Sequence, residues 1–351
     1  MTVPDVTVVT VSWQAAHLTL DCLASLAAQD LGGVRMHVVV VDNASTDGTA
    51  EAVAAAHPWA EVLRAPRNLG FAGGNVLALP RVASRYLVLL NNDAVAHPDA
   101  VRRLVAAMDA APADVAAMSA TVLLADRFRA AAPGDADVLE GPDGRWVRDP
   151  AGDVRLVNST GNEVRVDGCG QDRGWLARAA SHDPPADVFG FSGAAAVLRT
   201  SVLHEVGFFD TRFFMYYEDT DLSWRMRLAG YRVEHCAPAV VEHLHSASST
   251  EGSELFRFHD LRNRLATLTK DARVRTVVRV AVRELLTTAS LGLRRRRGDL
   301  AATRLRAFTS WVGLLPHLLR ERRRVGRLAR VSRRDVERLL VPATRGFGYR
   351  T

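Results

Sequence analysis

The chain of 351 residues contains only three cysteines and no long uncharged apolar run. Cys22, Cys169 and Cys236 are widely spaced and form no CxxC pair, so the sequence indicates neither a disulfide framework nor a zinc site. We expect a reducing, cytoplasmic environment. Without an apolar run of about 18 residues, a membrane-spanning helix is not expected. The first residues lack a basic segment before a long apolar stretch, so we expect a strand there and not a signal peptide.

A nicotinamide-binding fingerprint is also missing. It requires GxGxxG directly after the first strand, and the segment that follows the expected first strand, SWQAAHLTL, contains no glycine. The glycine-rich segment RNLGFAGGN at residues 67–75 comes later and has another spacing. Its glycines permit close approach of the backbone to a ligand, and a tight turn would explain them equally well.

Strand-like and helix-like segments alternate through the first part of the chain. This alternation predicts parallel βα units and therefore an α/β fold. Residues 126–187 are rich in Gly, Pro and Asp, and we predict an irregular insertion there, partly a loop over the site. The expected strands are residues 6–12, 36–43, 61–65 and 86–91. The expected helices are residues 17–30, 46–57, 73–84 and 98–110, and the third of them is expected to be interrupted near Pro80.

The apolar run at residues 86–90 ends in Asn91, Asn92 and Asp93. Open α/β sheets bind ligands outside the carboxyl ends of their strands. A carboxylate there is a good ligand for Mg²⁺ or Mn²⁺ that bridges to diphosphate oxygens, and Asn92 would contact a ribose. Capping of the following helix is the alternative for Asp93, but Asp99 or His97 is better placed for that role.

Two more strand ends carry polar side chains. Asp42 lies at the tip of the expected second strand, where a carboxylate can accept the N3–H of a uracil or thymine ring. The alternative is that Asp42 or Ser45 caps the next helix. Near residue 243, alternation puts His243 and His245 on one face, and a histidine there is a candidate ligand at a metal–diphosphate site.

The segment at residues 208–233 has six aromatic residues followed by Glu218, Asp219 and Asp221. Glu218 and Asp219 lie at an expected helix start next to apolar residues, a setting that suits a general base for an alcohol nucleophile. A favourable interaction of these carboxylates with the helix dipole is the alternative. Asp221 and Arg225 are spaced i, i+4 and are expected to form a structural pair.

Charge divides the chain into two parts. Residues 271–351 contain 21 arginines and 6 acidic residues, whereas acidic residues outnumber basic ones in residues 1–270. We predict a folded domain over 1–270 and a basic amphipathic helical extension over 271–351. Such helices lie on anionic membrane surfaces, with Phe308 and Trp311 as expected interfacial anchors. Oligomerisation is the second option, and nucleic acid is disfavoured because no reader motif accompanies the charge.

Six segments carry a resemblance to a known family: VTVVTVSWQ, VVDNASTDGT, RNLGFAGGN, LLNNDAV, EVGFFDTRFFMYYEDTDLSWRMRLAGYRV and FRFHDLRNRLATLTKDA. In this order they resemble the glycosyltransferase family 2 enzymes, especially the bacterial rhamnosyltransferase-like branch, over roughly residues 5–270. The resemblance implies a GT-A fold with a Rossmann-like mixed sheet. It also implies a nucleotide-sugar donor, a divalent metal (Mg²⁺ or Mn²⁺) and inversion at the anomeric carbon.

The resemblance also implies roles for single residues. Asp42 reads the nucleobase, Asp93 binds the metal diphosphate, Asp219 is the general base with Glu218 beside it, and His243 assists at the metal. The aspartate-rich metal motif common in the family is reduced here to one carboxylate, so modest metal affinity is expected. Further residues expected at the donor are Ser12, Arg67, Asn68, Gly73, Asn92, Arg262 and Asn263, and those expected at the acceptor are Gly193 and Trp224.

The function implied by the resemblance is transfer of a sugar to a hydroxyl of a cell-envelope glycan or lipid-linked acceptor. The first expectation for the donor is dTDP-rhamnose, and UDP-galactofuranose or a UDP-hexose is the alternative. A catalytically silent scaffold that recruits partners to a membrane is the alternative class, but the presence of Asp93, Asp219 and His243 favours activity. We expect a protein held peripherally at the inner face of the cell membrane, with a homo-oligomer as a further option.

Overall fold

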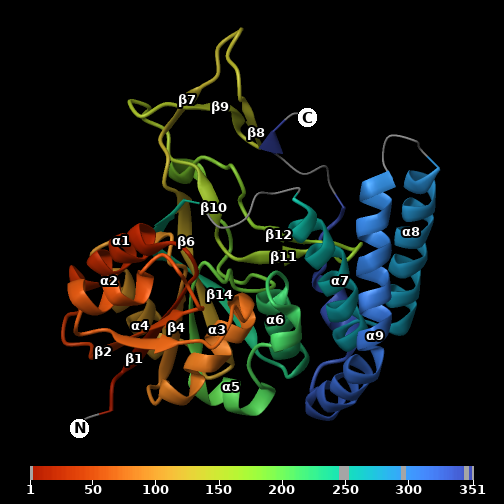
Figure 1. The fold of residues 1–351 in the computed structure, drawn as a ribbon, viewed down its shortest axis with the longest axis horizontal. Coiled ribbons are helices and arrows are strands. Elements are labelled where there is room, and N and C mark those ends of the chain that lie inside the picture. Colours follow the sequence, from red (N-terminus) through yellow and green to blue (C-terminus); the bar gives the residue numbers. More distant parts are fainter. Residues whose placement is uncertain (1–2, 245–252, 294–297, 344–347, 350–351) are drawn as a thin grey trace.

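A nine-stranded mixed sheet forms the centre of the molecule (Figure 1). The computed structural model describes residues 3–244, 253–293, 298–343 and 348–349. The strands of the sheet are β1 Val6–Ser12, β2 Met36–Asp42, β3 Glu61–Arg64, β4 Tyr86–Leu90, β5 Ala94–Ala96, β6 Val115–Leu124, β10 Val157–Ser159, β13 Ala195–Arg199 and β14 Arg232–His243. Their order is β3-β2-β1-β4-β13-β6-β14-β5, and β10 pairs with β6. The strand β1 is parallel to β2 and β4, whereas β13 is antiparallel to β4 and β6.

Helices cover both faces of this sheet. They are α1 Ala16–Ala27, α2 Thr49–Ala56, α3 Gly70–Ala78, α4 Ala100–Ala110, α5 Thr200–Val206 and α6 Glu218–Leu228. On one face, Val8 of β1 belongs to an apolar cluster with Leu23 of α1 and Leu104 of α4. On the other face, Val9 shares a cluster with Leu222 of α6. Strands that are buried on both faces read as continuous apolar runs, which is why the sequence predicted them.

The predicted alternation of strands and helices is confirmed, and so is the interruption expected near Pro80. The helix α3 ends at Ala78, and a 3₁₀ turn, Leu79–Arg81, follows it. Pro80 lies in this turn and lacks the N–H group that an α-helix needs to continue. The predicted helix at residues 73–84 is therefore shorter and begins earlier.

The segment 126–187 is more regular than predicted. The strands β7 Phe128–Ala130, β8 Leu139–Gly141 and β9 Gly144–Arg148 form a small sheet that projects from one end of the molecule (Figure 1), and β15 Gly348–Tyr349 pairs with β8. A hairpin of β11 Asn162–Val164 and β12 Gly170–Asp172 follows. The segment has its own apolar cluster, which contains Phe128, Leu139, Trp146, Leu156 and Leu176. Strands of three to five residues are too short to show alternation in the sequence.

Three long helices, α7 Glu254–Asp271, α8 Val274–Gly292 and α9 Gly298–Leu328, form one side of the molecule (Figure 1). A short helix, α10 Arg333–Val336, comes after them. Trp224 of α6 belongs to one apolar cluster with Leu265 of α7, Val280 of α8 and Phe308 of α9. These helices therefore share a core with the helix that begins at Glu218. Within the described ranges, no helix has the length and the apolar composition of a membrane span.

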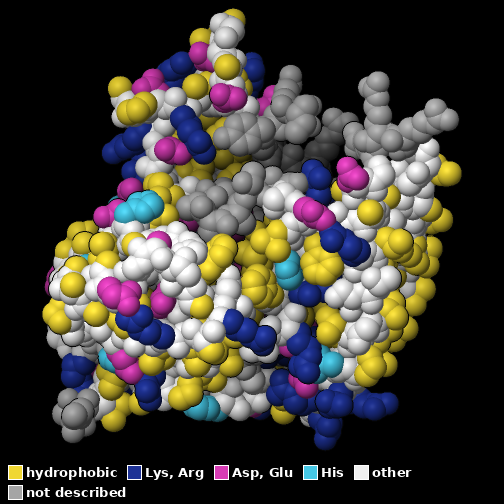
Figure 2. Space-filling view, in the orientation of Figure 1, with side chains coloured by type: hydrophobic (Ala, Val, Ile, Leu, Met, Phe, Trp, Pro, Cys, Tyr) yellow, Lys and Arg dark blue, Asp and Glu magenta, His cyan; other side chains and the backbone are white. Residues whose placement is uncertain are grey.

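Phe308 and Trp311 are not exposed anchors, so that prediction is wrong. Phe308 is only 4% exposed, and the half-buried Trp311 donates its indole N–H to Thr269 Oγ1 at 3.1 Å. Both aromatic side chains pack toward the core that α7 and α9 share. Figure 2 shows what the C-terminal helices expose instead: basic side chains at their lower end and hydrophobic side chains along their outer edge.

Candidate active site

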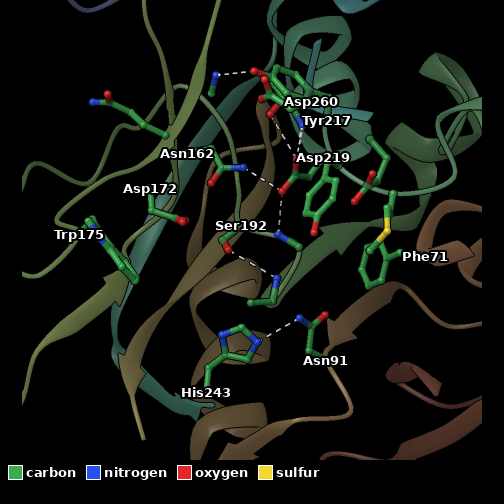
Figure 3. Close-up of a pocket in the computed structure, with 18 of the residues that line it drawn as sticks. Phe71, Asn91, Asn162, Asp172, Trp175, Ser192, Tyr217, Asp219, His243 and Asp260 are labelled. Atoms are coloured by element: carbon green, nitrogen blue, oxygen red, sulfur yellow. Dashed lines mark hydrogen bonds between the residues drawn. The ribbon is translucent and has the colours of Figure 1, made fainter. Parts of the chain in front are cut away.

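A cavity of about 1110 Å³ opens where strands of the central sheet end (Figure 3). Its walls come from the ends of β1, β2, β4 and β14, the first turn of α6, the start of α7 and the segment 126–187. The lining residues include Val11, Asn43, Asn68, Asn91, Asn92, Asp93, Asn162, Trp175, Gly193, Tyr217, Glu218, Asp219, His243 and Asp260. The cavity thus lies at the edge where open α/β sheets bind ligands.

Asp93 and His243 face one another at one end of the cavity. The Asp93 Oδ1 atom lies 3.0 Å from His243 Nε2, and Asn91 Nδ2 lies 3.2 Å from the same nitrogen. His243 Nδ1 is 2.7 Å from Asn158 Oδ1, so Nδ1 carries the proton that this amide oxygen accepts. Nε2 of His243 and the Asp93 carboxylate thus face one another, and a cation between them could take a ligand from each. His245, predicted on the same face, lies outside the described residues.

These two side chains are a partial ligand set. In the described part of the chain, no group of three or more His, Cys, Asp or Glu side chains is arranged to hold a metal ion. A divalent ion bound here would need oxygen atoms from a ligand or from water. Asn158, which orients His243 from β10, was not among the predicted site residues.

Asp219 lies in the first turn of α6 at the other end of the cavity and is partly buried. Its Oδ2 atom accepts hydrogen bonds from Asn162 Nδ2 at 2.8 Å and from the Gly193 N–H at 3.0 Å. Its Oδ1 atom accepts a hydrogen bond from the Thr220 N–H at 2.6 Å. Burial raises the pKa of Asp219, and these hydrogen bonds oppose the rise. All of these donors are neutral groups.

Glu218 is buried beside Asp219. Burial raises the pKa of Glu218 well above the usual range, and the charge of Asp219 adds to the rise. The Glu218 Oε2 atom has no hydrogen-bond partner among the described residues. Glu218 therefore favours the protonated form, and Asp219 is the better candidate for a base.

The backbone before α6 has an uncommon conformation. Phe214, Tyr216 and Tyr217 have φ angles of 66°, 68° and 71°, which residues other than glycine rarely adopt. The Asn263 side chain stabilises this loop, because its Nδ2 atom donates to three carbonyl oxygens of residues 213–216 at 2.8 to 2.9 Å. The position of Asp219 thus depends on a strained loop that α7 holds.

Three predicted contacts are wrong. Arg262 does not line the cavity but donates to the carbonyl oxygens of residues 212 and 213 at 2.9 and 2.8 Å, and Asn263 binds the same loop. These two side chains donate hydrogen bonds to backbone carbonyl groups and are therefore not available to the nucleotide-sugar donor. Trp224 is fully buried, with its ring 5.3 Å from that of Phe189, so it makes no acceptor contact. The predicted pair of Asp221 and Arg225 is confirmed at 2.9 Å.

Several residues expected at the donor lie behind the cavity wall. Ser12 is fully buried and shares a hydrogen bond with Thr19 at 2.7 Å. Asp42 is 4% exposed and accepts a hydrogen bond from the Ser45 N–H at 3.1 Å. The alternative that Asp42 or Ser45 caps α2 is wrong, because the N-cap residue of this helix is Gly48. Gly73 is buried inside α3, and Arg67 is exposed. These four are not among the lining residues. Recognition of a nucleobase by Asp42 stays a prediction.

Asn43 lines the cavity and was missed, although it is the last residue of a predicted strand. Its Nδ2 atom donates to Asn68 Oδ1 at 3.0 Å and to the Gly70 carbonyl at 3.1 Å, and its Oδ1 atom accepts the Leu69 N–H at 2.9 Å. Gly70 has a φ of 70°, and a Cβ atom there would lie 2.3 Å from the Phe214 carbonyl oxygen. The glycine-rich segment therefore packs against the loop that precedes Asp219.

A second group of missed residues surrounds Asp219. Trp175 and Asp172 come from the segment 126–187, and Tyr217 and Asp260 come from the α6 and α7 side (Figure 3). The Gly170 N–H donates to Tyr217 Oη at 3.1 Å. Burial raises the pKa of Asp260, and nearby positive charge opposes the rise. Tyr217 and Asp260 lie in segments that carry the family resemblance, but no role was predicted for them, and only the fold brings the four residues together.

Comparison with known families identifies the chain. Residues 7–134 match the family Glycosyl transferase family 2, and residues 176–312 match Glycosyl transferase family group 2. The chain belongs to glycosyltransferase family 2. The two matched ranges together make up most of its length and include Asp93, Asp219 and His243.

Two proteins with similar sequences indicate the kind of reaction found among relatives of this family 2 member. The succinoglycan biosynthesis protein ExoO of Rhizobium meliloti (strain 1021) is 34% identical over 125 residues, which are 35% of each chain. An N-acetylglucosaminyl-diphospho-decaprenol L-rhamnosyltransferase of Mycobacterium tuberculosis (strain ATCC 25618 / H37Rv) is 29% identical over 234 residues, which are 61% of this chain and 67% of that protein. The chain thus spans about a third of the first relative's length.

Solved structures agree with the GT-A fold. S. aureus TarS 1-349 in complex with UDP-GlcNAc has a TM-score of 0.51 at 15% identity, covering 95% of this chain and 90% of that one. GalNAc-T7 with UDP, GalNAc and Mn²⁺ has a TM-score of 0.55 at 12% identity, covering 77% of this chain and 48% of that one. At such identities the likeness concerns the fold alone, and it confirms the expected fold class.

Proposed function

We propose that this family 2 protein is an inverting glycosyltransferase in which Asp219 is the general base and Asp93 holds the metal-bound diphosphate of a nucleotide-sugar donor. The observation that carries the proposal is that one cavity has two differently built carboxylates. Asp93 lies beside the imidazole nitrogen of His243, and Asp219 lies among neutral hydrogen-bond donors.

The reaction needs one displacement and one proton transfer. An acceptor hydroxyl oxygen forms a bond to the anomeric carbon while the bond from that carbon to the diphosphate breaks. The hydroxyl proton passes to Asp219, which burial makes more basic than an exposed aspartate. Asn162 and the Gly193 N–H fix the orientation of the carboxylate. Because the nucleophile enters opposite to the leaving group, the anomeric configuration inverts.

The residues at the other end fit a divalent cation. Asp93 and His243 bring a carboxylate oxygen and a nitrogen lone pair within 3.0 Å of each other, a repulsive approach unless a cation or a proton is shared. These two residues would hold Mg²⁺ or Mn²⁺. When bound, the ion would neutralise charge that develops on the diphosphate leaving group. The name of the GalNAc-T7 complex, which includes Mn²⁺, supports the same choice.

For the donor sugar and the acceptor, the first choice is rhamnose, from dTDP-rhamnose, and a lipid-linked saccharide of the cell envelope. The support is the name of the M. tuberculosis relative, an N-acetylglucosaminyl-diphospho-decaprenol L-rhamnosyltransferase. UDP-galactofuranose or a UDP-hexose is the second choice, because the TarS and GalNAc-T7 structures are described with UDP-GlcNAc and with UDP.

A donor screen tests this function. Purified protein is incubated with Mn²⁺ and dTDP-rhamnose, UDP-galactofuranose, UDP-glucose or GDP-mannose, with and without a polyprenyl diphosphate N-acetylglucosamine acceptor, and released nucleoside diphosphate is measured. We expect acceptor-dependent release from dTDP-rhamnose that Asp219→Asn abolishes. Release from GDP-mannose alone would contradict the donor class. Absence of release from every donor would instead favour the silent scaffold.

A further inference from the structure

We propose that the outer face of helix α8 is a docking surface for an anionic lipid bilayer. The outer face is a row of large apolar side chains that are about half to two thirds exposed. It consists of Val274 (63% exposed), Val278 (55%), Val282 (50%), Leu285 (48%) and Leu286 (67%). This surface replaces Phe308 and Trp311, which the sequence suggested: Phe308 is buried in the core and Trp311 is half-buried against it.

The spacing places these side chains on one side of the helix. Steps of three and four residues keep side chains in a single row along an α-helix. The opposite side is buried: Thr276, Val280, Glu284 and Thr288 are all less than 10% exposed. The helix α8 therefore has two faces with different tasks, one that completes the core with α7 and α9 and one that faces outward.

Arginines line one edge of the outer face. Arg275, Arg279 and Arg283 each follow one of its valines by a single residue, and all three are exposed. The only acidic residue of the helix, Glu284, is buried and pairs with Arg264 at 3.2 Å and with Arg304. Arg283 also lies 3.5 Å from the buried Asp167, and Arg279 donates to the Val166 carbonyl at 2.8 Å. The edge remains cationic, because the helix itself has no exposed acidic residue beside it.

The neighbouring helix extends the apolar surface. Leu305 and Val312 of α9 are 56% and 54% exposed, and the heptad spacing puts them in one row. The helix α9 packs against α8, where Arg304 donates to Thr288 Oγ1 at 3.0 Å. Figure 2 shows hydrophobic side chains along the outer edge of the molecule at the position of these helices in Figure 1.

This combination of properties favours a bilayer over other partners. A second copy of the chain would bring the same patch against itself in a twofold interface, and the cationic edges would then face one another without carboxylates between them. A nucleic acid would leave the apolar row uncovered. An anionic leaflet matches both the apolar row and the cationic edge, because acyl chains bury the apolar side chains while head groups neutralise the arginines.

The test uses vesicles of equal parts phosphatidylglycerol and phosphatidylcholine, with pure phosphatidylcholine vesicles as the uncharged comparison. Full-length protein, the double variant Val282→Ser/Leu286→Ser and the control Trp59→Ser are sedimented with each. Trp59 is 44% exposed and lies between α2 and β3, away from the outer face. We expect the wild-type protein and the control to bind the anionic vesicles in a salt-sensitive manner, and the double variant to bind about tenfold or more weakly.

Three results would overturn the proposal. The first is unchanged vesicle binding by the double variant, and the second is no preference of the wild-type protein for anionic vesicles. The third is a wild-type dimer, found by sedimentation equilibrium, that the double variant converts to a monomer, because this would assign the face to a second copy. A circular dichroism melt of each variant checks that it is folded. Release of nucleoside diphosphate in solution should stay unchanged in the double variant, so this test is independent of the proposed reaction.

Discussion

The two ends of the cavity contain the same kind of side chain in different surroundings. Asp93 has a histidine nitrogen 3.0 Å away, whereas Asp219 is surrounded by an amide and two backbone N–H groups. A carboxylate beside a nitrogen lone pair attracts a cation. A partly buried carboxylate with neutral donors has a raised pKa and accepts a proton more readily. The comparison teaches that residue type alone does not set the role of an aspartate.

The largest expected effect is that of Asp219→Asn. Asparagine keeps the shape of the side chain but cannot accept the proton of the acceptor, so the rate of transfer should fall by a factor of about 10² to 10⁴. Single-turnover transfer from the preferred donor measures this loss. A variant that keeps more than a tenth of the wild-type rate would remove Asp219 from the role of base.

Asp93→Asn should act through the metal. Loss of this carboxylate leaves His243 as the remaining ligand of the proposed pair, so activity should require a roughly tenfold or higher Mn²⁺ concentration. The measurement is a titration of initial rate against Mn²⁺ for both proteins. Equal Mn²⁺ dependence, or full activity of the wild-type protein in EDTA, would separate Asp93 from the metal.

Asn263→Ala tests whether the strained loop sets the position of Asp219. The change removes three hydrogen bonds to the loop, so kcat should fall by about tenfold, while the affinity for nucleoside diphosphate stays within about twofold. The free energy of unfolding should fall by about 1–3 kcal/mol.

Thr267→Val is the matched control on the same helix, because Thr267 is buried and its Oγ1 has no hydrogen-bond partner among the described residues. It should change neither kcat nor affinity. If Asn263→Ala lowers stability but leaves kcat unchanged, the loop does not position the base.

The smallest expected effect concerns stability and pH. The pKa of Glu218 is raised in the folded protein, so the folded state binds a proton that the unfolded state releases above a pH of about 4.3. Wild-type stability should therefore decline as pH rises from there toward the raised pKa. Glu218→Gln removes this titration. Its melting temperature should exceed that of the wild-type protein increasingly from pH 5 to pH 8, and a constant difference across this range would contradict the assignment.

The sequence predicted the parts of the molecule that local pattern determines. The buried strands β1, β2 and β4 are continuous apolar runs, and a polar residue after such a run falls at the ligand-binding edge of the sheet. For that reason the sequence alone indicated that Asp93 and His243 lie at this edge of the sheet. Asp219 was predicted as a general base because it lies at the start of a helix that aromatic residues precede.

Other parts depend on contacts that no local pattern contains. Arg262 and Asn263 have polar groups that could bind a nucleotide-sugar donor. Only the structure shows that they donate hydrogen bonds to carbonyl groups of residues 212–216 instead. The helices α8 and α9 are apolar on two sides, and the sequence does not tell which side packs inward. This is why Phe308 was predicted at a surface and lies in the core.

The most direct test of the central claim is calorimetric titration of dTDP into the wild-type protein, Asp219→Asn and Asp93→Asn, each with and without Mn²⁺. We expect Asp219→Asn to bind dTDP like the wild-type protein, with the same gain in affinity from Mn²⁺. We expect Asp93→Asn to lose that gain and to bind about equally under both conditions. The reverse pattern, with the Mn²⁺-dependent gain lost in Asp219→Asn and kept in Asp93→Asn, would contradict the assignment of the two carboxylates.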